Sequence, residues 1–235
     1  MTGSTDRAQL LRLDLGCGNA KREGFVGLDS MPGPAVDHVL DLTVDQFPFP
    51  DDSVDEIFSA HFLEHIDSPN HLFGEIGRTC RDRARIEFWT PYAFTNEAFL
   101  YGHLHGITEE MWLHLGVSHR DIYAPMLQGR WQLLRFVYVI DQTTIDDLNS
   151  HNVELDFAVR YFKGVVRELG VEIEYRQDLS APVCVPQRVY TASRFGDRLA
   201  LVSSAPKPQP ALGSVARLRS AARKLIPRRS LFPSS

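Results

Sequence analysis

Five short apolar runs in the first part of the chain have the character of strands buried in a parallel sheet. They cover residues 10–15, 25–29, 36–42, 54–60 and 85–91. Parallel strands that are buried on both faces show nearly continuous apolar runs, and the third run also alternates. Between the last two runs, Leu72, Ile76 and Cys80 recur at helical spacing over residues 69–80. Strands that alternate with helical or turn segments predict an α/β fold, with a mostly parallel sheet covered on both faces.

An aromatic and His-rich stretch, residues 92–130, interrupts this rhythm. It lacks clean periodicity, and we expect it to be an inserted lid or acceptor-binding segment. Beyond it the pattern predicts strands over 131–140 and 171–175, a helix over 153–169 stopped by Gly170, and a last strand over 198–203. Prolines at positions 206, 208 and 210 then begin a linker. We therefore expect one α/β domain over residues 1–205, followed by a Pro-rich linker and basic tail over residues 206–235.

Composition narrows the class of protein. The chain of 235 residues is 43% hydrophobic and 23% charged, which excludes disordered, collagen-like and disulfide-scaffold classes. The N-terminus lacks the basic start and apolar run of a signal peptide, and no run approaches the roughly 18 apolar residues of a membrane helix. Cys17, Cys80 and Cys184 are odd in number and far apart, which favours reduced thiols. We expect a soluble, cytoplasmic protein.

Charge is distributed unevenly along the chain. Seven of the 25 Lys and Arg residues lie after residue 205, where no acidic residue occurs, so the preceding part carries 18 basic against 30 acidic residues. Such an acidic body argues against a nucleic-acid substrate. The tail has apolar residues at helix-like spacing, which fits contact with an anionic membrane surface or a partner, and equally a solvated terminus. The excess of Arg over Lys is typical of a GC-rich bacterial genome.

A glycine loop closes the first predicted strand, in the sequence Leu13-Asp14-Leu15-Gly16-Cys17-Gly18-Asn19. Glycines at a strand end let the backbone pass close beneath a ligand, and ligands of parallel sheets sit at the carboxyl ends of strands. Asp29 ends the second run and can accept hydrogen bonds from both hydroxyls of a ribose, while Asp41 ends the third. Position 21 is Lys rather than the third glycine of a dinucleotide fingerprint. The pattern predicts a ligand with ribose and adenine but no pyrophosphate, and its alternative is a plain tight turn.

The chain here resembles the class I S-adenosylmethionine-dependent methyltransferases. The resemblance rests on the glycine loop, on Asp29, on Asp41-Leu42, and on residues 47–57 and 59–66, and covers roughly residues 10–91. It implies a seven-stranded Rossmann-like sheet, mostly parallel with an antiparallel last strand, and S-adenosyl-L-methionine as cofactor. It also implies the cofactor-binding residues: Gly16, Cys17 and Gly18 under the methionine part, with Asp14 and Asn19 beside them, Asp29 and Ser30 at the ribose, Asp41 and Leu42 by the adenine, and His61 near the methionine end.

One departure from the family concerns the first crossover. Only about ten residues separate the first two strands, where a helical crossover takes a dozen or more. The first helix must be a stub or a loop, as in a compact branch of the family often linked to polysaccharide biosynthesis.

Histidines and a glutamate follow the fourth strand and recur in the predicted lid. On a helical turn, His61, Glu64 and His65 share one face, and His103 and His105 could complete a cluster from across the cleft. We expect His65, Glu64 and His103 to be catalytic, because methyl transfer to a hydroxyl needs an aligned nucleophile and a base. Glu64, His65, His103 and His105 are also candidate ligands of a divalent cation, Mg²⁺ or Mn²⁺. Such a cluster resembles that of some 2′-O-methyltransferases.

Two other interpretations of these residues stay open. Glu64 and His65 could brace their loop through hydrogen bonds alone. The segment 61–65 also matches an inverted zinc-protease pattern, which would require a long helix rather than a turn after a cofactor-binding strand.

The predicted lid favours a carbohydrate-like acceptor. It holds the aromatic residues Trp89, Tyr92, Phe94, Phe99, Tyr101, Trp112 and Tyr123 at or near its ends and within it. Aromatic faces pack on the C–H faces of sugars, although a small core or a homodimer interface would use them too. We expect a sugar O-methyltransferase whose partner is a small saccharide acceptor. The alternatives are an O- or N-methyltransferase of a natural product or lipid, and a non-catalytic cofactor-binding scaffold.

Overall fold

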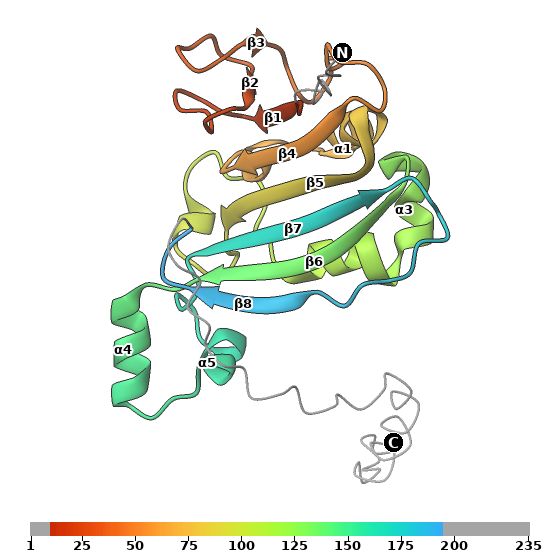
Figure 1. Cartoon of the computed structure of the whole chain (residues 1–235). Coiled ribbons are helices and arrows are strands. Elements are labelled where there is room, and N and C mark those ends of the chain that lie inside the picture. The colour runs from red at the N-terminus through yellow and green to blue at the C-terminus, as the bar shows by residue number, and fades with distance from the viewer. Residues whose placement is uncertain (1–9, 195–235) are drawn as a thin grey trace, which may run out of the picture. The chain divides into compact units, whose positions relative to one another are not determined.

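Eight strands of the computed structural model, which describes residues 10–194, form one mixed sheet in the order β3-β2-β1-β4-β5-β7-β6-β8 (Figure 1). The strands are β1 (Arg12–Leu15), β2 (Val26–Asp29), β3 (His38–Val39), β4 (Val54–Ala60), β5 (Cys80–Pro91), β6 (Arg130–Val139), β7 (Glu168–Arg176) and β8 (Gln187–Thr191). All neighbouring strands are parallel except where β7 pairs with β5 and with β6. The mostly parallel α/β sheet predicted from the sequence is confirmed.

The helices are α1 (Asn70–Thr79), α2 (Glu109–Leu113), α3 (Arg120–Leu127), α4 (Gln142–Ser150) and α5 (Leu155–Tyr161). Three shorter turns complete the list: η1 (Leu63–His65) and η2 (Glu97–Phe99) are 3-10 turns, and η3 (His114–Ser118) is π-helical. The helix predicted over residues 69–80 is α1. Among the described residues, no helix is long and apolar enough to cross a membrane.

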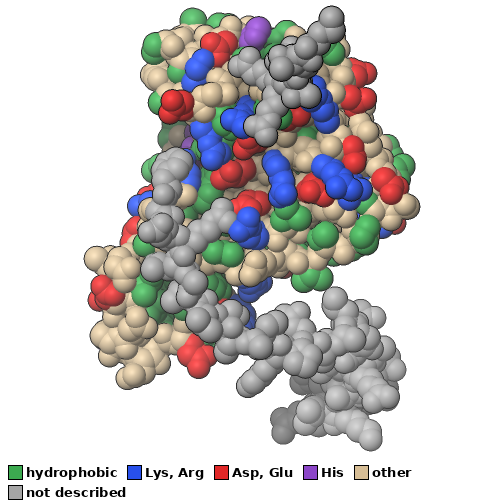
Figure 2. Space-filling view, in the orientation of Figure 1, with side chains coloured by type: hydrophobic (Ala, Val, Ile, Leu, Met, Phe, Trp, Pro, Cys, Tyr) green, Lys and Arg blue, Asp and Glu red, His purple; other side chains and the backbone are tan. Residues whose placement is uncertain are grey.

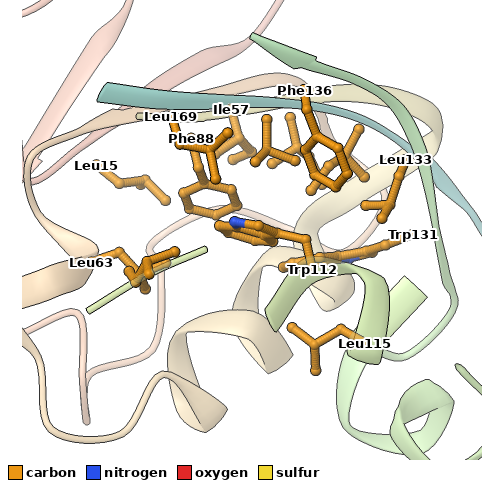
Figure 3. Packing of buried hydrophobic residues seen from close by; sticks show 14 of the residues in the cluster. Leu15, Ile57, Leu63, Phe88, Trp112, Leu115, Trp131, Leu133, Phe136 and Leu169 are labelled. Carbon is orange, nitrogen blue, oxygen red and sulfur yellow. The ribbon is translucent and has the colours of Figure 1, made fainter. Parts of the chain in front are cut away.

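The main core lies between the sheet and the helices α1, α2 and α3. Alternate residues of the central strands point into it, among them Phe88 of β5, which stacks on Trp112 of α2 at 5.2 Å between ring centroids. Trp131 of β6 also stacks on Trp112, at 6.4 Å between ring centroids (Figure 3). Trp112 is 0% exposed. Large aromatic side chains with this burial dominate core energetics.

Part of the predicted lid therefore belongs to the core. Residues 109–127 form α2, η3 and α3 and pack against α1 and β6, and only residues 92–108 form an irregular segment at the carboxyl end of β5. The prediction of one inserted lid over 92–130 was wrong for its second half. The physical reason is that Trp112 and Leu127 supply the apolar cover that the sheet needs.

In the second half of the chain, the helices and strands of the structure differ from those that the sequence pattern predicts. The predicted helix over 153–169 is wrong beyond Tyr161, because Leu169 and Gly170 belong to β7. Gly170 does not stop a helix but pairs with Trp89 of β5, whose ring leaves only 2.6 Å for a Cβ at that position. The antiparallel strand is β7, in the interior of the sheet, and the last described strand, β8, was not predicted. The expected strand over 198–203 and the tail over 206–235 lie outside the described residues.

One face of the sheet carries no helix within residues 10–194. This face is turned toward the viewer in Figure 1, and Figure 2 shows basic and acidic side chains across it. Ion pairs join neighbouring strands there, with Arg12–Glu56 at 3.2 Å and Arg135–Glu172 at 2.7 Å. The expectation of cover on both faces was wrong, because β1, β2 and β3 are linked by turns and loops without a helix. The predicted stub or loop between the first two strands is confirmed.

Candidate active site

The glycine loop is bonded to the neighbouring strand, since the backbone N–H of Gly16 donates to the carbonyl of Leu28 at 2.8 Å. Gly16 has φ +67°, and a Cβ on it would lie 2.3 Å from the ring of Phe62. Gly18 has φ +56°, and no atom lies within 4 Å of the position of its Cβ. Both positions favour glycine by conformation. At Gly16 the close neighbour is a side chain of the protein, whereas open space remains over Gly18.

Asp29 ends β2 directly beside this loop. Its Oδ2 accepts a hydrogen bond from the N–H of Gly18 at 2.8 Å, and its Oδ1 accepts one from the N–H of Met31 at 2.9 Å. A carboxylate offers about four lone-pair sites, so each oxygen can accept one more donor. The two backbone bonds hold the carboxylate in a fixed orientation in which both oxygens can meet the hydroxyls of a ribose.

The other residues predicted to contact the cofactor are Asp41, Leu42, Asn19 and Ser30, and they are spread over three loops. Asp41 is exposed, and its Oδ1 accepts hydrogen bonds from the N–H and hydroxyl of Thr43, which lower the pKa of the carboxyl. Leu42 is 2% exposed and belongs to the core, so its side chain is not available to a ligand. Asn19 and Ser30 are exposed on the loops that follow β1 and β2.

A cleft of about 330 Å³ opens at the carboxyl ends of β1 and β4. Its lining includes Asp14, Gly16, Cys17, Ala60, His61 and Arg194. Four of the predicted cofactor-binding residues therefore share one cleft. A larger cavity of about 600 Å³ lies between α1 and the segment from α2 to α3 and contains none of the predicted site residues.

Asp14 and Cys17 are poor candidates for acid–base or nucleophilic work. Burial raises the pKa of Asp14, although the hydrogen bond from the N–H of Arg22 at 2.7 Å opposes this shift. Burial, together with Asp14 and Asp29, raises the pKa of the Cys17 thiol to about 11. The thiol is therefore neutral at physiological pH, and Cys17 contributes backbone and volume to the cleft rather than a thiolate.

His61 links the cleft to a second group of side chains. It has φ +55°, an uncommon conformation for a residue other than glycine, and it directly follows β4. Its Nε2 lies 3.5 Å from Oε1 of Glu168, and its Nδ1 lies 3.3 Å from Oε1 of Glu64. These two carboxylates, Glu168 first, raise the pKa of His61 to about 9 against the opposing effects of burial and of Arg194. Burial would raise the pKa of Glu168, but His61 and Arg194 outweigh it and lower the pKa.

Glu64, His65 and His103 form this second group. One ligand atom from each lies within 4.8 Å of the other two. The imidazole rings are 4.6 Å apart between centroids and nearly perpendicular. A backbone hydrogen bond of 2.7 Å from the N–H of Leu104 to the carbonyl of Glu64 fixes the two segments against each other. The structure thus brings together residues that are almost forty positions apart.

The group contains buried polar atoms that lack a hydrogen bond. Glu64 is 1% exposed, and within residues 10–194 neither of its carboxylate oxygens accepts a hydrogen bond, although Oε1 forms an ion pair with His61. Nδ1 of His103 is also buried without a partner. Leaving such groups unsatisfied costs on the order of 1–3 kcal/mol each, and more when they are charged. The donor set of one carboxylate and two imidazoles fits a divalent cation with positions left open for a ligand.

His105 lies outside this group. Its Nε2 hydrogen-bonds to the carbonyl of Asp67 at 2.9 Å, and the structure unites only three of the four predicted ligands. The protease interpretation is excluded as well, because residues 63–65 form a three-residue 3-10 turn rather than a long helix.

Two residues of the site were missed by sequence reasoning. Glu168 begins β7, in a segment predicted as helix, and Arg194 follows β8, which was not predicted at all. Both reach His61 only through the pairing of distant strands. No local pattern in the sequence marks either of them.

The fold and the cleft agree with the resemblance found in the sequence. A sheet in the order 3-2-1-4-5-7-6 with β7 antiparallel, a glycine loop after β1 and an acid that ends β2 are the features expected of a class I methyltransferase. Residues 25–88 match the family model described as a methyltransferase domain. The chain therefore carries a region similar to a methyltransferase domain, within the fold that its resemblance to the class I methyltransferases predicts.

Solved structures that resemble this fold have low sequence identity to the chain. A SAM-dependent methyltransferase from Archaeoglobus fulgidus is 14% identical, with 71% of this chain and 86% of that chain covered and a TM-score of 0.45. A SAM-dependent methyltransferase from Mesorhizobium loti is 15% identical, with 70% and 90% covered and a TM-score of 0.44. No curated protein matches the sequence.

Proposed function

We propose that the protein transfers a methyl group from S-adenosyl-L-methionine to a hydroxyl of a small carbohydrate or oligosaccharide, with a divalent cation held by Glu64, His65 and His103. The observation that carries the proposal is the buried Glu64 carboxylate without a hydrogen-bond donor, opposite two imidazoles and connected through His61 to the cofactor cleft. His61 supplies one charged contact to this carboxylate at 3.3 Å, and a divalent cation would use the acceptor capacity of Glu64 that remains.

The chemistry asks for few protein groups. Methyl transfer is an in-line displacement: the acceptor oxygen attacks the methyl carbon, the carbon–sulfur bond breaks, and S-adenosylhomocysteine leaves. A divalent cation held by Glu64, His65 and His103 would lower the pKa of an acceptor hydroxyl and so ease the loss of its proton to water. Glu64 and the two imidazoles would hold the cation. The side chain of His61 lies between this group and the cofactor cleft. Imidazole ligands favour Mn²⁺ over Mg²⁺.

The loop that carries His103 supports a sugar acceptor. Three of its aromatic residues are exposed: Phe94 by 52%, Phe99 by 73% and Tyr101 completely. Large apolar side chains that remain in water on a loop beside a reactive group are candidates for ligand contact. The buried Trp89, Tyr92 and Trp112 belong to the cores of the domain instead and take no part in this argument.

The cation is tested by calorimetry with Mn²⁺ and by activity after chelation and reconstitution. Glu64→Gln and His103→Ala should each weaken Mn²⁺ binding by at least tenfold, because each removes one of only three protein ligands. His105→Ala is the matched control, since this neighbouring imidazole lies outside the group. Unchanged activity after exhaustive chelation would contradict the proposal.

The acceptor is tested by a screen with S-adenosylmethionine over saccharides, phenols and amines. Turnover with saccharides supports the proposal, and turnover confined to phenols or amines contradicts the sugar assignment. Phe99→Ala and Tyr101→Ala should raise KM for the saccharide more than they lower kcat, because they remove contact surface and not a reacting group.

A further inference from the structure

Arg194 contributes a fixed positive charge to the cofactor cleft. It lies three residues beyond the end of β8 and lines the same cleft as Gly16, Cys17 and His61. An arginine side chain stays charged at every physiological pH, and its planar guanidinium matches the geometry of a carboxylate. A guanidinium in this place can therefore recognise an anionic part of a ligand in the cleft.

Contacts with three residues of the described part of the chain hold the guanidinium in place. Its carbon lies 5.6 Å from the ring centroid of Trp89, and its Nε and Nη2 lie 3.1 and 3.0 Å from Oε2 of Glu168. Nη2 also lies 2.5 Å from Nε2 of His61, the residue that follows β4. The side chain of Arg194 is 17% exposed. These contacts place Arg194 at the His61 end of the cleft and restrict its motion, so that little side-chain entropy remains to be lost on binding.

The loop between β1 and β2 gives the cleft no helix N-terminus for binding an anion. A helix that begins after a glycine loop would aim its N-terminal N–H groups at a negative charge, but residues 16–25 contain no helix. The side chains of Lys21 and Arg22, which also line the cleft, pair with Asp37 at 2.5 Å and with Glu87 at 3.2 Å. Arg22 in addition lies over the ring of Phe58, 4.7 Å from its centroid.

We propose that Arg194 binds the α-carboxylate of the methionine part of the cofactor, in place of a helix N-terminus. The inference rests on the proposed function only in so far as S-adenosylmethionine occupies this cleft. The carboxylate approaches the guanidinium between Gly16 and His61, while Glu168 and Trp89 keep the guanidinium plane oriented. Arg194 is thus a cofactor-specificity residue supplied by the segment after β8.

Calorimetry with two ligands tests the assignment. Arg194→Gln should weaken binding of S-adenosylhomocysteine by about 10- to 100-fold, the effect of losing a charge-assisted pair. Binding of S-adenosylhomocysteine methyl ester, which lacks only the negative charge, should change less than about threefold by the same reasoning. Arg188→Gln is the matched control: Arg188 also lies over an aromatic ring, that of Tyr138, and pairs with Glu109 at 3.6 Å, but does not line the cleft.

Each result has one meaning. Equal loss for both ligands, or no loss for either, overturns the role of Arg194. Failure of the unaltered protein to bind S-adenosylhomocysteine overturns the cofactor assignment instead. If Arg194→Gln does not fold, as judged by circular dichroism, Arg194→Lys replaces it. This variant keeps the charge but loses the planar fork, and it should weaken binding of the acid several-fold while binding of the ester stays unchanged.

Discussion

Nδ1 of His61 lies 3.3 Å from Oε1 of Glu64, and this contact joins the two halves of the active site. On one side of the imidazole lies the cleft with the glycine loop, and on the other lies the group of Glu64, His65 and His103. The left-handed backbone of His61 turns the chain sharply at the end of β4. A cofactor in the cleft and an acceptor at Glu64 would therefore both lie next to His61.

Gly16 and Gly18 should respond differently to substitution by alanine. Gly16→Ala brings a methyl group within 2.3 Å of Phe62 and also strains the backbone, so we expect a loss of at least about 2 kcal/mol in the free energy of unfolding. Gly18→Ala meets no atom and should cost only about 1 kcal/mol from its conformation. Urea denaturation measures both. Equal losses would show that Phe62 does not require the glycine.

Asp29 should dominate recognition of the ribose. Asp29→Ala removes the acceptor of the Gly18 N–H together with any bond to the ribose, so the Kd for S-adenosylhomocysteine should rise about 10- to 100-fold. Asp178→Ala serves as the control, because Asp178 is an exposed acid that likewise accepts a nearby backbone N–H, that of Ser180. A Kd unchanged by Asp29→Ala would place the ribose elsewhere.

The thiol of Cys17 should resist alkylation at pH 8. Its pKa is raised to about 11, so the reactive thiolate is scarce until the pH approaches that value, whereas an ordinary thiol ionises near pH 8.5. Iodoacetamide should therefore modify the half-exposed Cys184 first. Peptide mass mapping over a pH series reports the order, and equal rates at Cys17 and Cys184 would contradict the shift.

Trp112 should matter for stability, although the sequence placed it in a lid. It is fully buried against Phe88 and Trp131, and Trp112→Ala should cost about 3–5 kcal/mol. Phe99→Ala should cost less than about 0.5 kcal/mol, because that ring is mostly in water. Thermal unfolding of the two variants makes the comparison. Similar melting temperatures would show that residues 109–127 do not contribute to the core.

The sequence was most informative where strands are buried and local. The runs that became β1, β2, β4 and β5 carry their own apolar signal, and the acids and glycines that end them mark the cofactor edge. The pattern failed at residues 162–170. Val165 and Val166 enter the core just before β7 and Leu169 enters it within β7, so they are apolar without forming one face of a helix. Tertiary packing there overrides local periodicity.

The candidate site divides in the same way. Glu64 and His65 are adjacent in the chain, and their spacing from His61 predicted that the three side chains would lie close together. Glu168 and Arg194 reach His61 only because β7 and β8 are added to the sheet beyond β5, and such pairing leaves no mark in a short window of sequence. The choice of His103 over His105 depends on the turn around Gly102, whose φ of +91° no side-chain pattern reveals.

The shortness of β3 affects how copies of this chain meet in solution. With only His38 and Val39 in the ladder, this border of the sheet offers a neighbouring molecule very few free amide and carbonyl groups with which to extend the strands. Uncontrolled growth into fibrils from that border is thereby discouraged, even though no helix of residues 10–194 shields it.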